Sequence, residues 1–341
     1  MKALFIGLGG AGQRHLRNLK EFMKDDLEVH AYRQLARKFE IGTDLSTDST
    51  INIEEKYSIQ THDSLQNALA QAPDAVFISN PTAHHIPAAL QAARAQCHLF
   101  IEKPLSHSLE SLEELESVVS FNDLTGFVAY QLRFHPNLQK IKELLQSKSI
   151  GKITGASFRV SSYLPDWHKY EDFRDLYAAK KELGGGVLLT ESHDFDIVHW
   201  FFGRPKNVFV QGGNLGPFEL DVEDTVNALL HFEDPDPFNV QLRLCFVQKP
   251  IERSIEIFGT SGKILWRADI CSVELHNDSG IEYFDETNFD RSTMFTQELR
   301  HFLRCINGKE APIVDISTAK ESLEIILACL QSLQTNQPVL I

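Results

Sequence analysis

The chain lacks the features that mark secreted, membrane-spanning and nucleic-acid-binding proteins. Its 341 residues include only five cysteines and no C-x-x-C pair, which disfavours a disulfide framework and indicates reduced thiols in a cytoplasmic protein. No apolar run approaches the ~18 residues of a membrane-spanning helix, and we expect no signal peptide, because glycines interrupt the apolar start. The formal net charge of -14 disfavours a broad nucleic-acid surface.

What the chain does have is a glycine fingerprint. The apolar run 1–6 is followed by G-L-G-G-A-G at 7–12, and a helical pattern opens directly afterwards. A strand that ends in G-x-G-x-x-G and turns into a helix predicts a dinucleotide site, in which backbone N–H groups meet the phosphates. The cofactor-binding residues expected in this loop are Gly7, Gly9, Gly10, Ala11, Gly12 and Arg14.

Strand and helix signals alternate through residues 1–126. After the first strand, strand patterns lie at 27–32, 75–79, 98–101 and 126–130. Helical patterns lie at 63–70, 85–95 and 108–120. This alternation predicts an α/β Rossmann domain with a parallel sheet covered on both faces. The polar stretch 41–57 shows no periodicity, and we interpret it as a surface excursion.

The remaining residues, 127–341, are rich in strand signals. Strands are expected at 154–163, 208–212, 225–232, 240–247, 254–258, 263–266 and 272–275. Helices are expected at 136–147, 193–202, 293–306 and 316–333. The pattern predicts an α+β substrate-binding domain with a large, open, mostly antiparallel sheet. Because the second face of such a sheet must be covered, we expect a homodimer or homotetramer through it.

Polar residues follow two of the expected parallel strands. Ligands bind at the carboxyl ends of such strands, so Gly9, Asn80 and Lys103 are expected to converge on one crevice. The polar and proline residues after these two strands are Asn80, Pro81, His85, Glu102, Lys103 and Pro104.

These motifs resemble those of the Gfo/Idh/MocA oxidoreductases (glucose–fructose oxidoreductase, inositol dehydrogenase and relatives), over nearly the full length. E-K-P at 102–104 is the specific element. The other matches are the glycine loop, P-x-x-x-H at 81–85, R-F-H-P at 133–136, I-G-K-I at 150–153 and GGG…H-x-x-D…W…G at 184–203. The resemblance implies NAD(P)-dependent hydride transfer at a hydroxyl or keto carbon of a sugar, sugar derivative or nucleotide-linked sugar. It also implies cofactor contacts from Asn80, Pro81, His85, Glu102 and Lys103.

Hydride transfer to or from an alcohol also moves a proton, which a side chain must take or return. The resemblance favours Lys103 for this role. The alternative is that Lys103 only anchors the substrate or pairs with Glu102. His193 is the second catalytic candidate, because a neutral imidazole exchanges a proton near physiological pH; the alternative is a residue that merely opens a helix.

The family commonly places an acid one turn before this histidine, where the present chain has Thr190. Glu191 or Asp196 can replace it, and Asp196 falls on the same helix face as His193. Substrate contacts are expected from Lys103, His193, Arg133, Trp167, Tyr177, Glu191 and Asp196. Trp167 can stack on a sugar face or fill the core.

The end of the second strand favours NADP over NAD. No acid follows Tyr32 before Glu40, whereas an acid near this point binds the ribose hydroxyls of NAD. Arg33 can pair with a 2′-phosphate or stack on adenine. We expect no catalytic metal, because His193 and His199 fall on different helix faces.

Two rival functions stay open at this stage. One is a non-catalytic, NAD(P)-binding regulatory sensor of the same fold, which Thr190 keeps open and the presence of Lys103 and His193 disfavours. The other is a reductase of a non-sugar substrate, which the polar, Trp-bearing segment 163–181 weakly disfavours.

Overall fold

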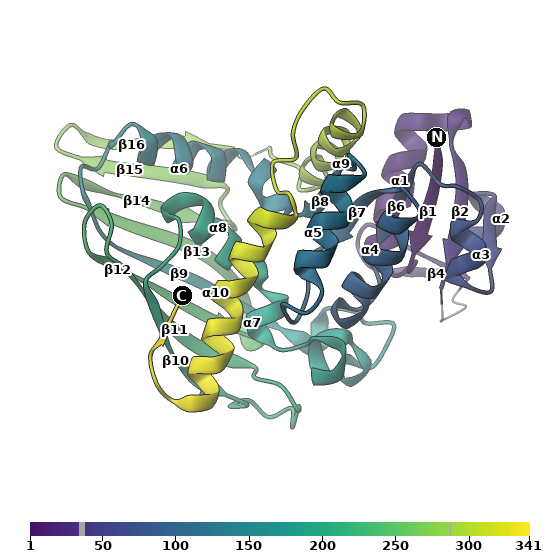
Figure 1. The fold of residues 1–341 in the computed structure, drawn as a ribbon. Coiled ribbons are helices and arrows are strands. Elements are labelled where there is room, and N and C mark those ends of the chain that lie inside the picture. The colour runs from purple at the N-terminus through teal and green to yellow at the C-terminus, as the bar shows by residue number, and fades with distance from the viewer. Residues whose placement is uncertain (34–37, 287) are drawn as a thin grey trace. The chain divides into compact units, whose positions relative to one another are not determined.

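The computed structural model describes residues 1–33, 38–286 and 288–341 (Figure 1). Two compact units share these residues. The first comprises 1–130, 168–172 and 295–320, and the second 131–167, 173–294 and 321–341. Division into domains at residue 126 stays a prediction, because compactness alone does not establish independent folding. In the described part of the chain, no helix is long and apolar enough to cross a membrane.

The first unit is built on a six-stranded parallel sheet in the order β5-β2-β1-β6-β7-β8. The strands are β1 (Lys2–Ile6), β2 (Glu28–Tyr32), β5 (Ile59–His62), β6 (Ala75–Ile78), β7 (His98–Glu102) and β8 (Gly126–Ala129). The helices that connect them are α1 (Gly10–Met23), α3 (Leu65–Leu69), α4 (His85–Arg94) and α5 (Leu112–Phe121). Strands β6 and β8 are buried along their whole length, as a sheet covered on both faces requires. The Rossmann prediction is therefore confirmed.

The surface excursion contains regular secondary structure. It forms a hairpin of β3 (Phe39–Ile41) and β4 (Thr47–Asn52), followed by the short helix α2 (Ile53–Lys56). Strand β4 is exposed or half-buried along its length, which fits a surface excursion and explains why no apolar alternation marks the strand in the sequence. Contacts with α1 hold the hairpin: the Gln13 amide accepts from the N–H of Ile41 and donates to the carbonyl of Phe39.

The second unit is built on a nine-stranded sheet in the order β16-β15-β14-β13-β9-β12-β11-β10-β17. Neighbouring strands run antiparallel except for the parallel pair β9 and β12, which confirms the mostly antiparallel prediction. The strands are β9 (Ile153–Tyr163), β10 (Asn207–Gly213), β11 (Thr225–Phe232), β12 (Phe238–Cys245), β13 (Val247–Gly259), β14 (Gly262–Arg267), β15 (Ser272–Asn277), β16 (Gly280–Asp285) and β17 (Val339–Leu340). The sequence patterns missed β16 and β17, which bury little apolar surface.

The helices of this unit lie on one face of its sheet (Figure 1). They are α6 (Pro136–Gln146), α7 (Val187–Thr190), α8 (Ser192–Phe202) and the part of α10 (Ile316–Thr335) from residue 321 on, whereas α9 (Ser292–Ile306) lies almost wholly in the first unit. On the covered face, Trp266 is buried and donates to Asn137 of α6. On the other face, Leu229 is 46% and Tyr283 57% exposed. This second face carries mainly polar side chains with a few exposed apolar ones among them, and no helix of the described part of this unit covers it.

Candidate active site

The N-terminal glycine loop (residues 7–12) is packed tightly at its two ends. Gly7 has a φ of 89°, and a Cβ there would lie 2.8 Å from the carbonyl oxygen of Ser79. A Cβ on Gly12 would collide with the carbonyl oxygen of Gly7 and the hydroxyl of Ser79. These glycines let β1, the start of α1 and the end of β6 approach one another, as the motif predicts.

The middle of this loop is open. Among the described residues, no atom lies within 4 Å of the position that a Cβ on Gly9 would take. Gly9 is also the N-cap of the fourteen-residue helix α1, whose first N–H groups carry partial positive charge. An open backbone at a helix N-terminus fits the pyrophosphate of a dinucleotide, so Gly9 satisfies this test for the expected cofactor.

The loops after β6 and β7 are tied together by a buried histidine. His85 is 1% exposed, with Nδ1 2.9 Å from the carbonyl oxygen of Pro104 and Nε2 2.9 Å from that of Asn80. Burial lowers the pKa of His85, and a neutral ring donates only one of these two contacts. His85 therefore positions the two loops. Pro81, at the start of the turn before α4, stays half-buried.

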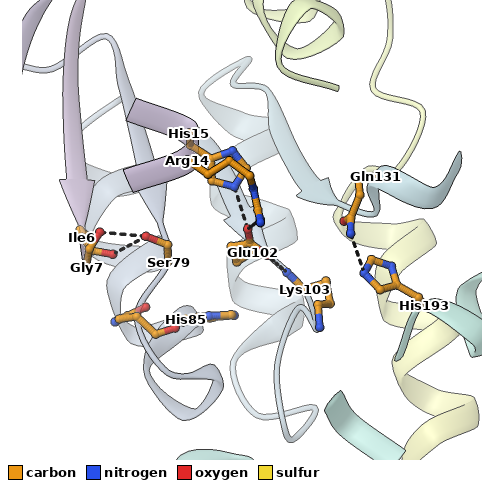
Figure 2. Close-up of polar contacts among 11 residues, drawn as sticks. Ile6, Gly7, Arg14, His15, Ser79, His85, Glu102, Lys103, Gln131 and His193 are labelled. Carbon is orange, nitrogen blue, oxygen red and sulfur yellow. Dashed lines mark hydrogen bonds and ion pairs between the residues drawn. The ribbon is translucent and has the colours of Figure 1, made fainter. Parts of the chain in front are cut away.

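Glu102, at the end of β7, is the centre of a charged cluster (Figure 2). Its Oε1 lies 2.7 Å from Nε2 of His15 and 3.5 Å from Nη2 of Arg14. Burial alone would raise the pKa of Glu102, but the hydrogen bond from His15 and the positive charges around it bring the pKa to about 2. Glu102 is thus ionised, and its Oε2 accepts the backbone N–H of the half-buried Lys103 at 3.3 Å.

One buried acid beside this cluster escaped the sequence analysis. Glu298 of α9 is 1% exposed, and neither of its carboxylate oxygens has a hydrogen-bond partner among the described residues. Phe295, one turn earlier, lies 3.8 Å from the Arg14 guanidinium. Burial and the charge of Glu102 hold the pKa of Glu298 well above its usual value. No sequence signal marks this acid, because α9 is far from Glu102 along the chain.

His193 lies in the first turn of α8 in the second unit. The amide nitrogen of Gln131 lies 3.1 Å from its Nε2 (Figure 2). An amide nitrogen only donates, so with the amide in this orientation Nε2 accepts and the ring proton sits on Nδ1. Gln131 was not predicted, and its amide contacts the ring of the candidate catalytic histidine.

Arginines hold the two carboxylates that we considered as partners for His193. Both oxygens of the buried Asp196 accept from the buried Arg133, at 2.9 and 2.8 Å. Glu191 accepts from Arg253 at 2.8 Å, and Asp194 lies 3.2 Å from the same guanidinium. The buried ion pair of Arg133 and Asp196 joins α8 to the turn before α6, and a role of Asp196 in orienting His193 stays a prediction.

The second glycine loop (residues 184–186) leads into α7 and is filled by the protein itself. A Cβ on Gly185 would collide with the backbone of Tyr177 and Ala178, and one on Gly186 with the carboxylate of Glu223. Oε1 of Glu223 accepts the N–H of Leu188 at 3.0 Å. Burial raises the pKa of Glu223 to about 7.

Two further candidates, Trp167 and Arg33, contact other side chains of the protein. Trp167 is half-buried, with its ring centroid 5.1 Å from that of Phe246, which favours core packing over an open stacking surface. Arg33 pairs with Glu54. In residues 1–33, 38–286 and 288–341, no cluster of three His, Cys, Asp or Glu side chains is arranged to hold a metal ion.

Comparisons with known proteins agree with this geometry. A family described as "Oxidoreductase family, NAD-binding Rossmann fold" matches residues 1–130, and the "GFO/IDH/MocA C-terminal domain" matches residues 138–265. The chain is 26% identical to myo-inositol 2-dehydrogenase of Thermotoga maritima, over 99% of this chain and 98% of that protein. It is 22% identical to D-xylose 1-dehydrogenase [NADP(+)] of Haloarcula marismortui, over 84% of this chain and 80% of that protein.

A solved structure shows the same fold. The WlbA dehydrogenase from Bordetella pertussis, in complex with NADH and UDP-GlcNAcA, superposes with a TM-score of 0.80 and 19% identity, over 100% of this chain and 98% of that one. The glycine loop, the E-K-P strand end and the large open sheet occur here in one chain, in the order of the two matched domains. The chain therefore belongs to the GFO/IDH/MocA family of oxidoreductases.

Proposed function

We propose that the protein is an NADP-dependent oxidoreductase that transfers a hydride to or from a hydroxyl or keto carbon of a sugar, a sugar derivative or a nucleotide-linked sugar. The observation that carries this proposal is the open backbone at Gly9, set between two tightly packed glycines and directly before a long helix. Relatives whose names specify inositol, xylose and UDP-GlcNAcA support the substrate class.

The cofactor is proposed to lie along the carboxyl ends of the parallel strands. The N-terminal glycine loop would hold the pyrophosphate, and Asn80 and Pro81 would border it. The choice of NADP over NAD rests on Arg33, which directly follows β2. Relatives and neighbours name both NADP(+) and NADH, so this choice needs its own test.

Lys103 and His193 are proposed to handle the proton that accompanies hydride transfer. The bound nicotinamide supplies or accepts the hydride. Nζ of Lys103 takes the proton from the substrate hydroxyl or returns it to the ketone oxygen. Glu102 positions Lys103 through its backbone N–H, and Gln131 keeps His193 in the tautomer with its proton on Nδ1.

The sugar is proposed to contact the loop regions of the second unit. Trp167, Tyr177 and Glu191 remain the candidate substrate contacts. Arg133 and Asp196 form a buried ion pair, and we propose that they shape the site from beneath rather than touch the sugar.

The open sheet face is proposed to pair with a second copy of the chain. Leu229, Gln241, Ser157, Glu256, Leu265, Glu274 and Tyr283 stand in register across it. A homodimer or homotetramer would cover the exposed apolar side chains in this row. All five cysteines are free thiols, which supports a cytoplasmic location.

The test of this function starts with purified protein and the two reduced dinucleotides. Titration with NADPH and NADH, followed by intrinsic tryptophan fluorescence, is expected to show saturable binding with NADPH bound more tightly. Turnover is then assayed with oxidised cofactor against inositols, aldoses and nucleotide-linked sugars, with Lys103→Met as the inactive variant. If the protein binds dinucleotide but turns over none of these sugars, the result would favour the non-catalytic regulatory sensor or the reductase of a non-sugar substrate.

A further inference from the structure

The end of β2 lies beside the N-terminal glycine loop. Tyr32 pairs with Ile6 in the parallel register of β1 and β2, and its carbonyl accepts the N–H of Gly7 at 3.1 Å. In this fold the residue after the second strand meets the adenosine ribose of the dinucleotide. Arg33 occupies that position. The charged groups around it therefore influence whether the bound cofactor carries a 2′-phosphate, as in NADP, or a free 2′-hydroxyl, as in NAD.

A carboxylate reaches Arg33 from a segment twenty-one residues further along the chain. Glu54 of α2 accepts a hydrogen bond from Nη2 of Arg33, and its other oxygen lies 3.0 Å from Nζ of Lys38. The Arg33 side chain is only 7% exposed and that of Glu54 19%. Among the described residues, the Glu54 carboxylate is therefore shared by two cations, Arg33 and Lys38.

The fold holds Glu54 firmly in place. Asn52 caps α2 and accepts the N–H of Glu54 at 3.0 Å, and the N–H of the buried Ile53 donates to the carbonyl of Lys38 at 2.9 Å. The hairpin that precedes α2 is fastened to α1 through Gln13, which also donates to the carbonyl of Leu8 in the glycine loop. Gln13 thus contacts both the N-terminal glycine loop and the hairpin that leads into Glu54.

We propose that Glu54 is a specificity-determining residue that competes with the 2′-phosphate of NADP for Arg33 and Lys38. A phosphate carries about -1.5 to -2 charges near pH 7, so it must displace or repel the carboxylate, whereas the ribose hydroxyls of NAD can donate to it. Arg33 raises the affinity for NADP relative to NAD, and Glu54 therefore lowers this affinity ratio. This inference rests on the proposed NADP site.

The test compares two neighbouring carboxylates of α2. Glu54→Gln removes the competing charge, while Glu55→Gln removes an exposed charge whose carboxylate accepts from Asn52. Dissociation constants are measured by calorimetry for NADPH and NADH, and for adenosine 2′-monophosphate and 5′-monophosphate, which match in charge and size. Glu54→Gln is expected to raise the NADPH-to-NADH affinity ratio about tenfold and to favour the 2′-monophosphate, while Glu55→Gln leaves both ratios unchanged.

A double-mutant cycle assigns the effect to the arginine. In an Arg33→Ala background, most of the gain from Glu54→Gln is expected to disappear, because the competing partner is gone. Equal ratios in Glu54→Gln and Glu55→Gln, with wild-type thermal stability in both, would overturn the inference and leave the dinucleotide site standing. If the wild type binds neither dinucleotide, the proposed cofactor and this inference both fall.

Discussion

The N-terminal glycine loop of the first unit and the second glycine loop of the second unit both lead into helices, but different atoms surround their glycines. In the first, the position of a Cβ on Gly9 is open. In the second, backbone of Tyr177 and Ala178 and the carboxylate of Glu223 fill the space beside Gly185 and Gly186. The opening beside Gly9 can admit a ligand, whereas the space beside Gly185 and Gly186 is filled by the protein itself.

A glycine in such a motif can therefore have one of two structural roles. A glycine whose missing side chain leaves an opening can admit a ligand, whereas one whose missing side chain is replaced by protein atoms serves packing. Each unit also contains a buried acid with a raised pKa, Glu298 in the first unit and Glu223 in the second. Substitutions at Gly186 and Gly9 test the two glycine loops, and substitutions at Glu298 and Glu223 test the two acids.

The largest effect is expected from Gly186→Ala. A Cβ there is strained by a φ of 102° and collides with the Glu223 carboxylate, so we expect a loss of about 4 kcal/mol in the free energy of unfolding. Gly203→Ala is the matched control, because Gly203 has a φ of 83° but no described atom near its Cβ position. Its loss should be about 1 kcal/mol in the same urea titration. Equal losses would show that the second glycine loop is not filled.

Glu298→Gln is expected to stabilise the protein at alkaline pH. Because the folded pKa of Glu298 is raised, the unfolded chain releases this proton first, and wild-type stability falls as pH rises above about 4.5. Glutamine cannot ionise, so the variant should gain on the order of 3 kcal/mol over wild type at pH 8.5. The gain should vanish near pH 4. Thermal unfolding across this range checks it, with the exposed Glu113→Gln as control; a constant difference at all pH values would contradict it.

Glu223→Gln should behave in the same direction over a narrower pH range. Here the folded pKa is about 7, so wild-type stability falls between about pH 4.5 and 7 and is level above that window. The variant keeps an acceptor for the N–H of Leu188 and should gain about 3 kcal/mol above pH 7. A stability difference that still grows between pH 8 and 9 would show that another group causes it.

Gly9→Ala should leave stability unchanged and weaken the dinucleotide site. No described atom opposes the new methyl group, but it would stand where the phosphates approach, and we expect about tenfold weaker binding of both NADPH and NADH. Gly155→Ala is the control, since its Cβ would make only ordinary contacts with Asn239 and Phe258. Wild-type affinity in Gly9→Ala would remove the main support for the proposed function.

Local patterns were sufficient for most of the fold. Apolar periodicity located the central strands of both sheets and the major helices, because these elements bury one or both faces. The same logic failed for β4, β16 and β17, whose exposed residues carry no alternation. The predicted convergence of Gly9, Asn80 and Lys103 followed from strand ends in one parallel sheet, and all three do lie after strands of that sheet.

The sequence by itself determined the family, the two sheet architectures and the residues of the N-terminal glycine loop, because motifs and periodicities are local properties of a chain. Only the tertiary structure decided the electrostatic partners: Glu54 at Arg33, Asp196 at Arg133, and Glu298 beside Glu102. These pairs join residues far apart along the chain. Attraction between opposite charges, repulsion between like charges and burial all act through space, so no spacing rule in the sequence could have assigned these neighbours.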